Sequence, residues 1–183
     1  MSSNLAVPTI DRRGNCSLHL MQAALFQDVL EAFSVQGWAY REVEGREVVE
    51  SAFEAHHGKV SLHVQAYSPA GLVSVVAQCS VLVPPSHRAV AAQLLMRANE
   101  SLNLGALELL WDRGEVVFRV GNLFAAPRGD AKVIAALVHA AIAEIDRITP
   151  CVAEVCRQPA HSLGPREIAA LLAREDWLPT AAP

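Results

Sequence analysis

The sequence lacks the residues and spacings that most catalytic and metal sites need. Its 183 residues include four cysteines, Cys16, Cys79, Cys151 and Cys156, and no C-x-x-C pair. They are too sparse for a disulfide framework, so we expect reduced thiols that pack inside a cytoplasmic protein. There is no G-x-S-x-G elbow and no glycine-rich phosphate loop. The sequence therefore predicts no catalytic residue, no metal site and no cofactor.

Positive charge and long apolar runs are also scarce. Only Lys59 and Lys132 are lysines, the arginines are scattered, and the net charge is −4. A general nucleic-acid binder would show clustered basic residues, so this class is disfavoured. The longest apolar run, 133–143, is too short to cross a bilayer, and Arg12–Arg13 precedes no apolar export segment. We expect a cytoplasmic protein with no nucleic-acid and no membrane partner.

Hydrophobic residues are plentiful, at 52% of the chain, which is enough to build a core. Apolar side chains recur at helical spacing over 18–33, from about Ser86 to Leu102, and from about Asp130 onward. Ser86 is the expected cap of the second helix. Pro150 is expected to bend or break the third, because proline removes a backbone donor and clashes with the preceding turn.

Between these helices lie segments in which apolar and polar residues alternate, as they do in half-buried strands. The clearest are Val60 to Tyr67 and Leu72 to Val83, which are joined by a Ser-Pro-Ala-Gly turn. The remaining strands are expected over 46–55, 106–111 and 115–123. Strands that occur as hairpins favour an α+β fold of order α-β-β-β-α-β-β-α, with helices packed on an antiparallel sheet.

The chain divides into three parts. Residues 1–16 are expected to form a flexible arm, 17–157 the α+β domain, and 158–183 a tail with a short amphipathic helix. The tail helix starts near Pro165, a residue that suits the first helical position. Its apolar side chains are the weak candidates for partner binding: Ile168, Leu171, Leu172 and Trp177. The helix either docks on its own domain, which we favour, or lies in a groove of a partner.

His56, His57 and His63 are the best candidates for a metal or small-molecule site, with Cys79 or Trp38 nearby. Metal binding needs ligands that converge on one point. Adjacent histidines in an extended segment point to opposite faces, so we expect a solvated turn here. Binding of a metal or a small molecule remains the alternative function.

Several strings resemble the YbjN-like family of small bacterial proteins, whose fold is similar to that of type III secretion chaperones. These strings are Gly37-Trp38-Ala39-Tyr40, Val83-Pro84-Pro85, Arg97 to Asn103 with Gly105, Gly114 to Arg119, and Ala143 to Pro150. The resemblance covers roughly Leu18 to Cys156. It implies a non-enzymatic role in regulation or in binding other proteins, and it supplies no catalytic residues.

The sequence thus predicts a non-catalytic regulatory or protein-interaction module, an adaptor or chaperone-like domain. A fold alone does not identify its partner. Small α+β domains with an exposed sheet edge often pair, so a homodimer is an open alternative.

Overall fold

The computed structural model describes residues 16–125 and 128–174, with side chains from residue 24 onward. The expected arm and Trp177 therefore lie outside the described residues. Four α-helices are described: α1 (Cys16–Gln36), α2 (Arg88–Asn99), α3 (Ala131–Arg157) and α4 (Pro165–Leu172). Six strands are described: β1 (Arg41–Glu42), β2 (Val48–Glu54), β3 (Lys59–Tyr67), β4 (Leu72–Leu82), β5 (Ala106–Leu110) and β6 (Glu115–Leu123).

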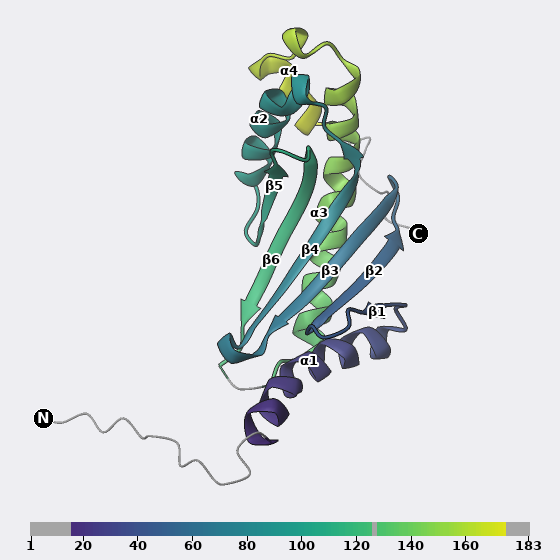
Figure 1. The fold of residues 1–183 in the computed structure, drawn as a ribbon. Coiled ribbons are helices and arrows are strands. Elements are labelled where there is room, and N and C mark those ends of the chain that lie inside the picture. The colour runs from purple at the N-terminus through teal and green to yellow at the C-terminus, as the bar shows by residue number, and fades with distance from the viewer. Residues whose placement is uncertain (1–15, 126–127, 175–183) are drawn as a thin grey trace, which may run out of the picture.

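The six strands form one antiparallel sheet in the order β1-β2-β3-β4-β6-β5 (Figure 1). The α+β class and the helices packed on an antiparallel sheet are confirmed. The expected order contained five strands, so it missed β1. Two residues are too few to show the alternation from which strands are recognised. The hairpin strands themselves begin and end within a few residues of their expected positions.

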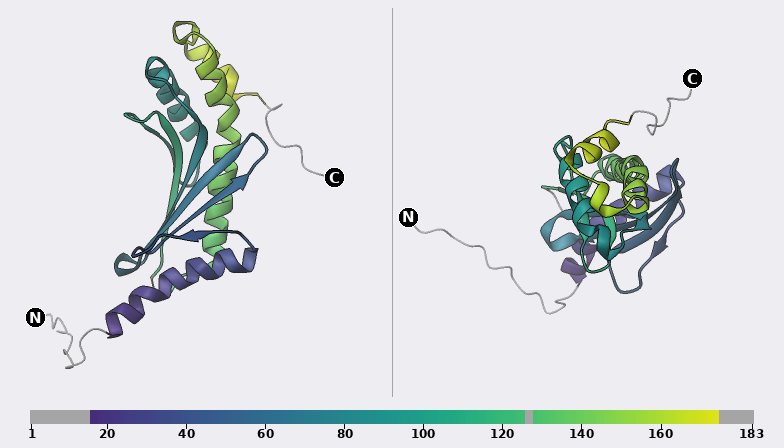
Figure 2. Two further views of the ribbon diagram at one scale, coloured as in Figure 1. Left: turned by 45° about the vertical axis from the view of Figure 1, so that its right-hand side comes forward. Right: turned by 90° about the horizontal axis from the view of Figure 1, so that it is seen from above.

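The long helix α3 lies along one face of the sheet, behind the strands in Figure 1, and contacts β3, β4 and β6. Side chains that point to this face are buried, for example Val64 on β3, Val75 on β4 and Phe118 on β6. The α1 helix packs against α3 at one end of the sheet, and Figure 2 shows it crossing α3 steeply. The α2 helix packs on β5 at the other end. The hydrophobic core therefore lies between one sheet face and the helices.

Pro150 does not interrupt α3, which continues to Arg157. The expectation of a break was wrong because the helix is buried on both sides of the proline, at Ile148 and at Val152. Burying an apolar side chain contributes about 1.5–3 kcal/mol, so two such residues offset a proline cost of about 3 kcal/mol.

Ser86 does not cap α2 as expected. The residue at the N-cap position is His87, no side chain supplies a capping hydrogen bond, and a short 3₁₀ turn, Pro85–His87, precedes the helix. Ser86 Oγ instead lies 2.9 Å from His87 Nδ1. Pro85 keeps the preceding Pro84 extended and itself begins the 3₁₀ turn, so the chain enters the helix by way of this tighter turn.

The hairpin turn at Gly114 is formed as expected. Gly114 has φ +71°, and its N–H donates to Leu110 O at 2.8 Å. Its carbonyl accepts from Val83 N–H at 2.8 Å, and a Cβ at this position would lie 2.2 Å from Val83 O. Only glycine fits this turn, which attaches the β5–β6 hairpin to the end of β4.

Two buried carboxylates join distant parts of the chain. Asp28 on α1 accepts from Arg128 Nη2 at 2.7 Å and from Gly129 N–H at 2.6 Å. Asp146 on α3 accepts from His57 N–H at 2.6 Å. Both side chains are almost fully buried, so these hydrogen bonds satisfy carboxylates that would otherwise be costly to desolvate. Their role is to hold the fold.

Candidate functional site

The second face of the sheet is the candidate site. Because side chains alternate along a strand, residues such as Glu50, His63, Val76 and Arg119 point away from α3. Among the described residues no helix packs on this face, which is turned toward the reader in Figure 1. We call this surface, formed by the outward side chains of β2, β3, β4 and β6, the open face.

One row across the middle of the open face contains charged residues on both sides of the sheet. In register, Arg41 lies opposite Glu50, then come His63, Val76 and Arg119 on successive strands. This set is called the charged row. Arg41 forms an ion pair with Glu50 at the β1 side of the row. The row therefore carries charge toward its two ends and none at Val76 near its centre.

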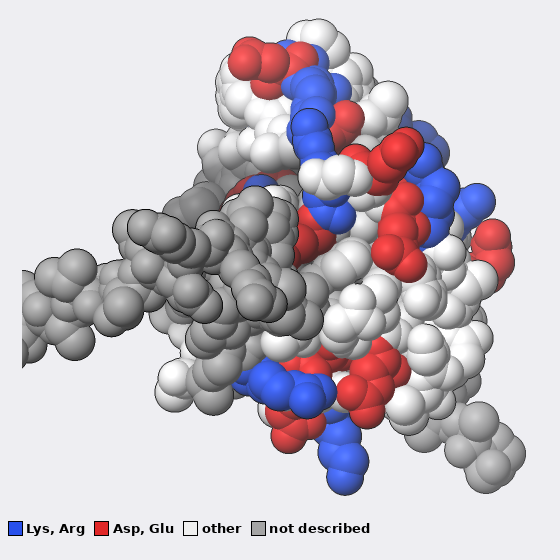
Figure 3. All heavy atoms as spheres, turned by 60° about the horizontal axis from the view of Figure 1, so that its bottom comes forward, with Lys and Arg blue, Asp and Glu red and all other residues white. Residues whose placement is uncertain are grey.

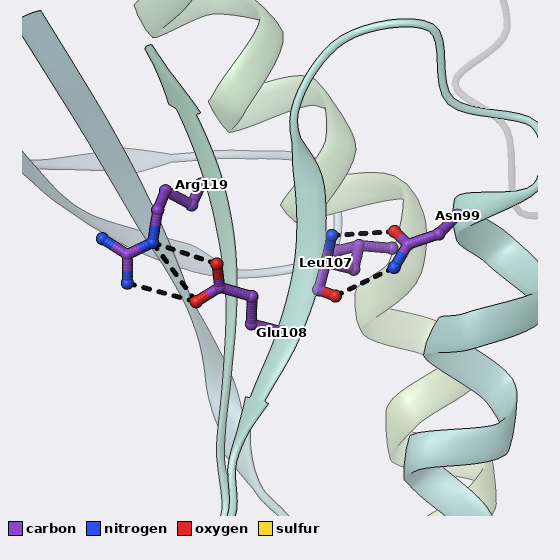
Figure 4. A network of polar contacts seen from close by, with 4 residues as sticks. All are labelled: Asn99, Leu107, Glu108 and Arg119. Carbon is purple, nitrogen blue, oxygen red and sulfur yellow. Dashed lines mark hydrogen bonds and ion pairs between the residues drawn. The ribbon is translucent and has the colours of Figure 1, made fainter.

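Arg119 forms the second ion pair of the row, with Glu108 on β5 (Figure 4). Its Nε lies 3.0 Å from Oε1, and its Nη2 lies 3.1 Å from Oε2. The hydrogen bond to Glu108 raises the pKa of Arg119, so the guanidinium stays protonated. Both groups are partly exposed, so a partner could also reach them.

A second row on the open face is apolar. Tyr67 on β3, Leu72 on β4 and Leu123 on β6 are adjacent in register, and we call them the apolar row. Leu123 is 70% exposed and Tyr67 42% exposed. The Tyr67 hydroxyl donates to Gln65 Oε1 at 2.9 Å. An exposed group of large apolar side chains beside polar ones is typical of an interaction surface.

Between the two strands at the centre, the open face is hollowed. A shallow depression of about 310 Å³ lies among Glu50, His63, Val76 and Gln78. Such a depression could take a protruding side chain of a partner. Its residues present no buried, unpaired polar group.

Asn99 shields the β5 edge of the sheet. Its Nδ2 donates to Leu107 O at 3.0 Å, and its Oδ1 accepts from Leu107 N–H at 2.8 Å (Figure 4). The amide thus replaces the strand that would otherwise pair there. On the far edge, β1 covers only the first half of β2. The β5 edge is therefore closed to a further strand, whereas the open face is available for binding.

His63 is not brought together with His56 and His57, the other two histidines expected to be ligand candidates. His63 lies on the open face between Glu50 and Val76, whereas His57 is held to Asp146 of α3 at the end of the β2–β3 hairpin. The rings of His56 and His57 contact each other, with centroids 4.5 Å apart. The expectation that they point to opposite faces was wrong, because the segment bends rather than extends.

In the part of the chain that the structure describes, no group of three or more His, Cys, Asp or Glu side chains could hold a metal ion. Trp38, named as a possible neighbour, instead packs its ring against Phe33, Phe53 and His139. The donor set of the metal alternative is therefore not assembled around His56, His57 and His63.

The three described cysteines, Cys79, Cys151 and Cys156, are free thiols. Burial raises the pKa of Cys151 to about 11 and also raises the pKa of Cys156. Cys79 is buried, with its Sγ 3.4 Å from Thr149 Oγ1. Reactive cysteines have a lowered pKa, so Cys151 and Cys156 have the character of packing residues.

The tail helix α4 packs against α2. Ile168 is fully buried and Leu171 nearly so, both within the core of the same chain, and Leu172 is partly buried. Cys151 Sγ also contacts Leu171 O at 3.6 Å. Of the weak partner-binding candidates, the three described ones are thus occupied within their own fold.

Acidic and basic side chains lie beside each other in Figure 3, and neither sign forms a continuous area in that view. No described helix is long and apolar enough to cross a membrane. Comparison with protein-family models and with curated proteins finds no match to this chain.

Sequence reasoning identified the outward residues of β3, because Ser61, His63, Gln65 and Tyr67 alternate with buried ones. It missed the two rows. Which residues share a row depends on register between strands, and in these two rows β4 and β6 pair through residues more than 40 positions apart, Val76 with Arg119 and Leu72 with Leu123. The spacing of polar residues within one strand does not reveal which residues of other strands lie beside them.

Proposed function

We propose that this chain is a non-catalytic protein-interaction module, adaptor or chaperone-like, that binds protein through the open face. The observation that carries the proposal is a sheet face left uncovered by the described helices and crossed by an apolar and a charged row. Sheet faces of soluble domains are usually covered or evenly polar. Exposed Leu123 and Tyr67 supply apolar surface that a partner can bury, and the ion pairs supply charges that can orient the partner.

Buried and half-buried polar groups support this proposal through the hydrogen bonds that they form within the chain. Asp28, Asp146 and Asn99 each hold two parts of the chain together. General acid or base chemistry needs such a group to face a substrate site. A module whose polar side chains hold the fold, with an uncovered face beside them, suits binding better than catalysis.

Membership of the YbjN-like family is part of the same proposal. The helices and hairpins occur in the order that the resemblance implies, with β1 added. The resembling strings include Asn99, which hydrogen-bonds to Leu107 of β5, and Asp146, which hydrogen-bonds to His57 in the β2–β3 turn. These residues would be retained for the fold, and they agree with a regulatory or protein-binding role in the cytoplasm of a bacterium.

Site-specific photo-crosslinking in lysate tests the function. A benzophenone amino acid is placed at Ser61 or Gln78, which are register neighbours on the open face. Matched controls carry it at Ala136 or Ala143, exposed positions of α3. We expect discrete covalent products with protein from the open-face positions and none from the controls. Equal or absent products at all four positions would refute the proposal.

A further inference from the structure

The charges of the open face change sign across its midline. The midline runs between β3 and β4, with β2 and β1 on one side and β6 and β5 on the other. On the first side, Glu50 lies nearer the midline and Arg41 farther out. On the second, Arg119 lies nearer, and its partner Glu108 lies on the outer strand two residues along, in register with Val117. Within the charged row, Glu50 and Arg119 thus have opposite charges at mirrored positions. These two positions are complementary to each other in a facing copy.

We propose that a second copy of this chain packs on the open face, related by a two-fold axis that runs along the strands between β3 and β4. This inference rests on the proposed function, since it names the partner of the same surface. The axis places Glu50 against Arg119 of the second copy, and Arg41 against the β5 position Ala106, which is in register with Arg119. At each end of the row, the Arg41–Glu50 pair of one copy meets the Arg119–Glu108 pair of the other, with Glu50 and Arg119 facing each other.

The charges also select this axis over the other two-fold axis that can relate facing sheets. An axis running across the strands, through the charged row, would bring Glu50 against Glu50 of the second copy and Arg119 against Arg119. Like charges brought together at an interface cost several kcal/mol. The axis along the strands avoids both repulsions.

The apolar row gives an independent reason for the same axis. Rotation about the strand direction keeps each row against itself, so Tyr67 lies opposite Leu72 of the second copy. The axis across the strands would instead bring the apolar row toward Lys59 and Ser80, at the opposite end of the face. Apolar burial is gained only in the first arrangement.

Packing of this kind has an ordinary geometry. Two twisted sheets stack about 10 Å apart with strands aligned to within about 30°. Near the midline His63 lies opposite Val76 of the second copy, and Ser61 lies opposite Gln78. The depression beside Val76 can accept the opposing His63 ring. The dimer is isologous, with one patch used twice, as most homodimer interfaces are.

Sedimentation velocity on the full chain tests the proposal, over about 1–100 μM and at low and high salt. We expect a dimer that weakens with salt. Glu50→Arg and Arg119→Glu should each raise the dissociation constant at least about tenfold. An equimolar mixture of these two variants should regain the dimer, because each chain then supplies the charge that opposes the other's. The double variant should regain it as well.

Arg157→Glu is the matched control, since Arg157 is an exposed, ion-paired arginine of α3 away from the open face. The dissociation constant of its dimer should equal that of the wild type. Circular dichroism melting confirms that each variant is folded, and the mixing result excludes a folding defect as the cause. A wild type that stays monomeric at about 100 μM, or a mixture with no gain over the single variants, overturns this inference.

Crosslinking distinguishes failure of the proposed function from failure of the dimer. If the wild type is monomeric but Ser61 still crosslinks to a protein of different mass, the open face binds another protein and only the second copy is wrong. If Ser61 crosslinks to nothing, both proposals fall.

Discussion

Asn99 at the end of α2 holds Leu107 of β5 with both atoms of its amide, at 3.0 Å and 2.8 Å. Leu107 belongs to the last strand of the sheet, so its outward N–H and C=O would otherwise lack a strand partner. One side chain thus ends the sheet and fixes α2 against it.

Asn99→Asp should destabilise the protein by about 1–3 kcal/mol, because the carboxylate loses the donor to Leu107 O and faces a carbonyl oxygen. Urea unfolding measures the change. Asn103→Asp is the matched control: Asn103 is exposed and has no hydrogen bond to any described residue, so it should change stability by less than about 0.5 kcal/mol. Equal effects of the two substitutions would contradict the edge-capping role.

Much of the fold could be predicted from the sequence because the strands alternate cleanly and the helices carry continuous apolar stripes. β6 was expected over 115–123 and lies at Glu115–Leu123. Local rules failed where packing outweighs them. Pro150 should break a helix, yet the burial of α3 on both sides of it prevails. The bend at His56 and His57 depends on Asp146, which is 89 residues away from His57 in the chain.

The candidate site could be predicted only in part. Alternation shows that His63 and Tyr67 point away from the core, but not what lies beside them. Glu50, His63 and Arg119 become one row only after three strand pairings set their register. The uncovered state of that face depends on where α1 and α3 pack, and their stripes alone do not say which sheet face they cover.

Asp28→Asn should cost about 1–3 kcal/mol of stability. The amide cannot accept from both Arg128 and Gly129, so one donor meets the new Nδ2 or is left unpaired in a buried site. Thermal or urea unfolding measures it. Glu31→Gln, an exposed position on the same helix, is the control and should be nearly neutral. Arg128→Ala should cost less than Asp28→Asn, since the Gly129 hydrogen bond remains.

Ile168→Ala should destabilise the whole domain by about 2–4 kcal/mol, because Ile168 is fully buried between α4 and the rest of the core. The control is Val35→Ala, at a side chain 74% exposed, which should change stability by about 0.5 kcal/mol or less. Deletion of residues after Arg157 should lower the melting temperature sharply. If the deletion leaves melting unchanged, α4 does not contribute to the fold.

Pro150→Ala should stabilise the protein by about 1–3 kcal/mol, because alanine restores a helical N–H for the Asp146 carbonyl and removes a ring from the interior of α3. Pro165→Ala is the same substitution at the first position of α4, where proline is favourable, and should give no gain. Urea unfolding of both variants provides the comparison. A loss of stability in Pro150→Ala would mean that the ring packs in a way alanine cannot replace.

Alkaline pH should destabilise the protein through Cys151. Burial raises the pKa of its thiol from 9.0 to about 11, so between those values the folded state binds more protons than the unfolded state. The contribution of this thiol to stability is therefore fully present below about pH 9. It decreases as pH rises toward 11, which lowers the free energy of unfolding by about 2 kcal/mol.

Cys151→Ala should remove that part of the decline, which urea unfolding at pH 8 and pH 10.5 measures. Cys156→Ala is the matched control. Its thiol is less buried, so the variant should keep most of the wild-type decline. Because wild type and Cys151→Ala share all other titrating groups, the difference between their two pH slopes isolates the Cys151 thiol. Parallel slopes in wild type and Cys151→Ala would show that this thiol ionises alike in both states, against its burial beside Leu171.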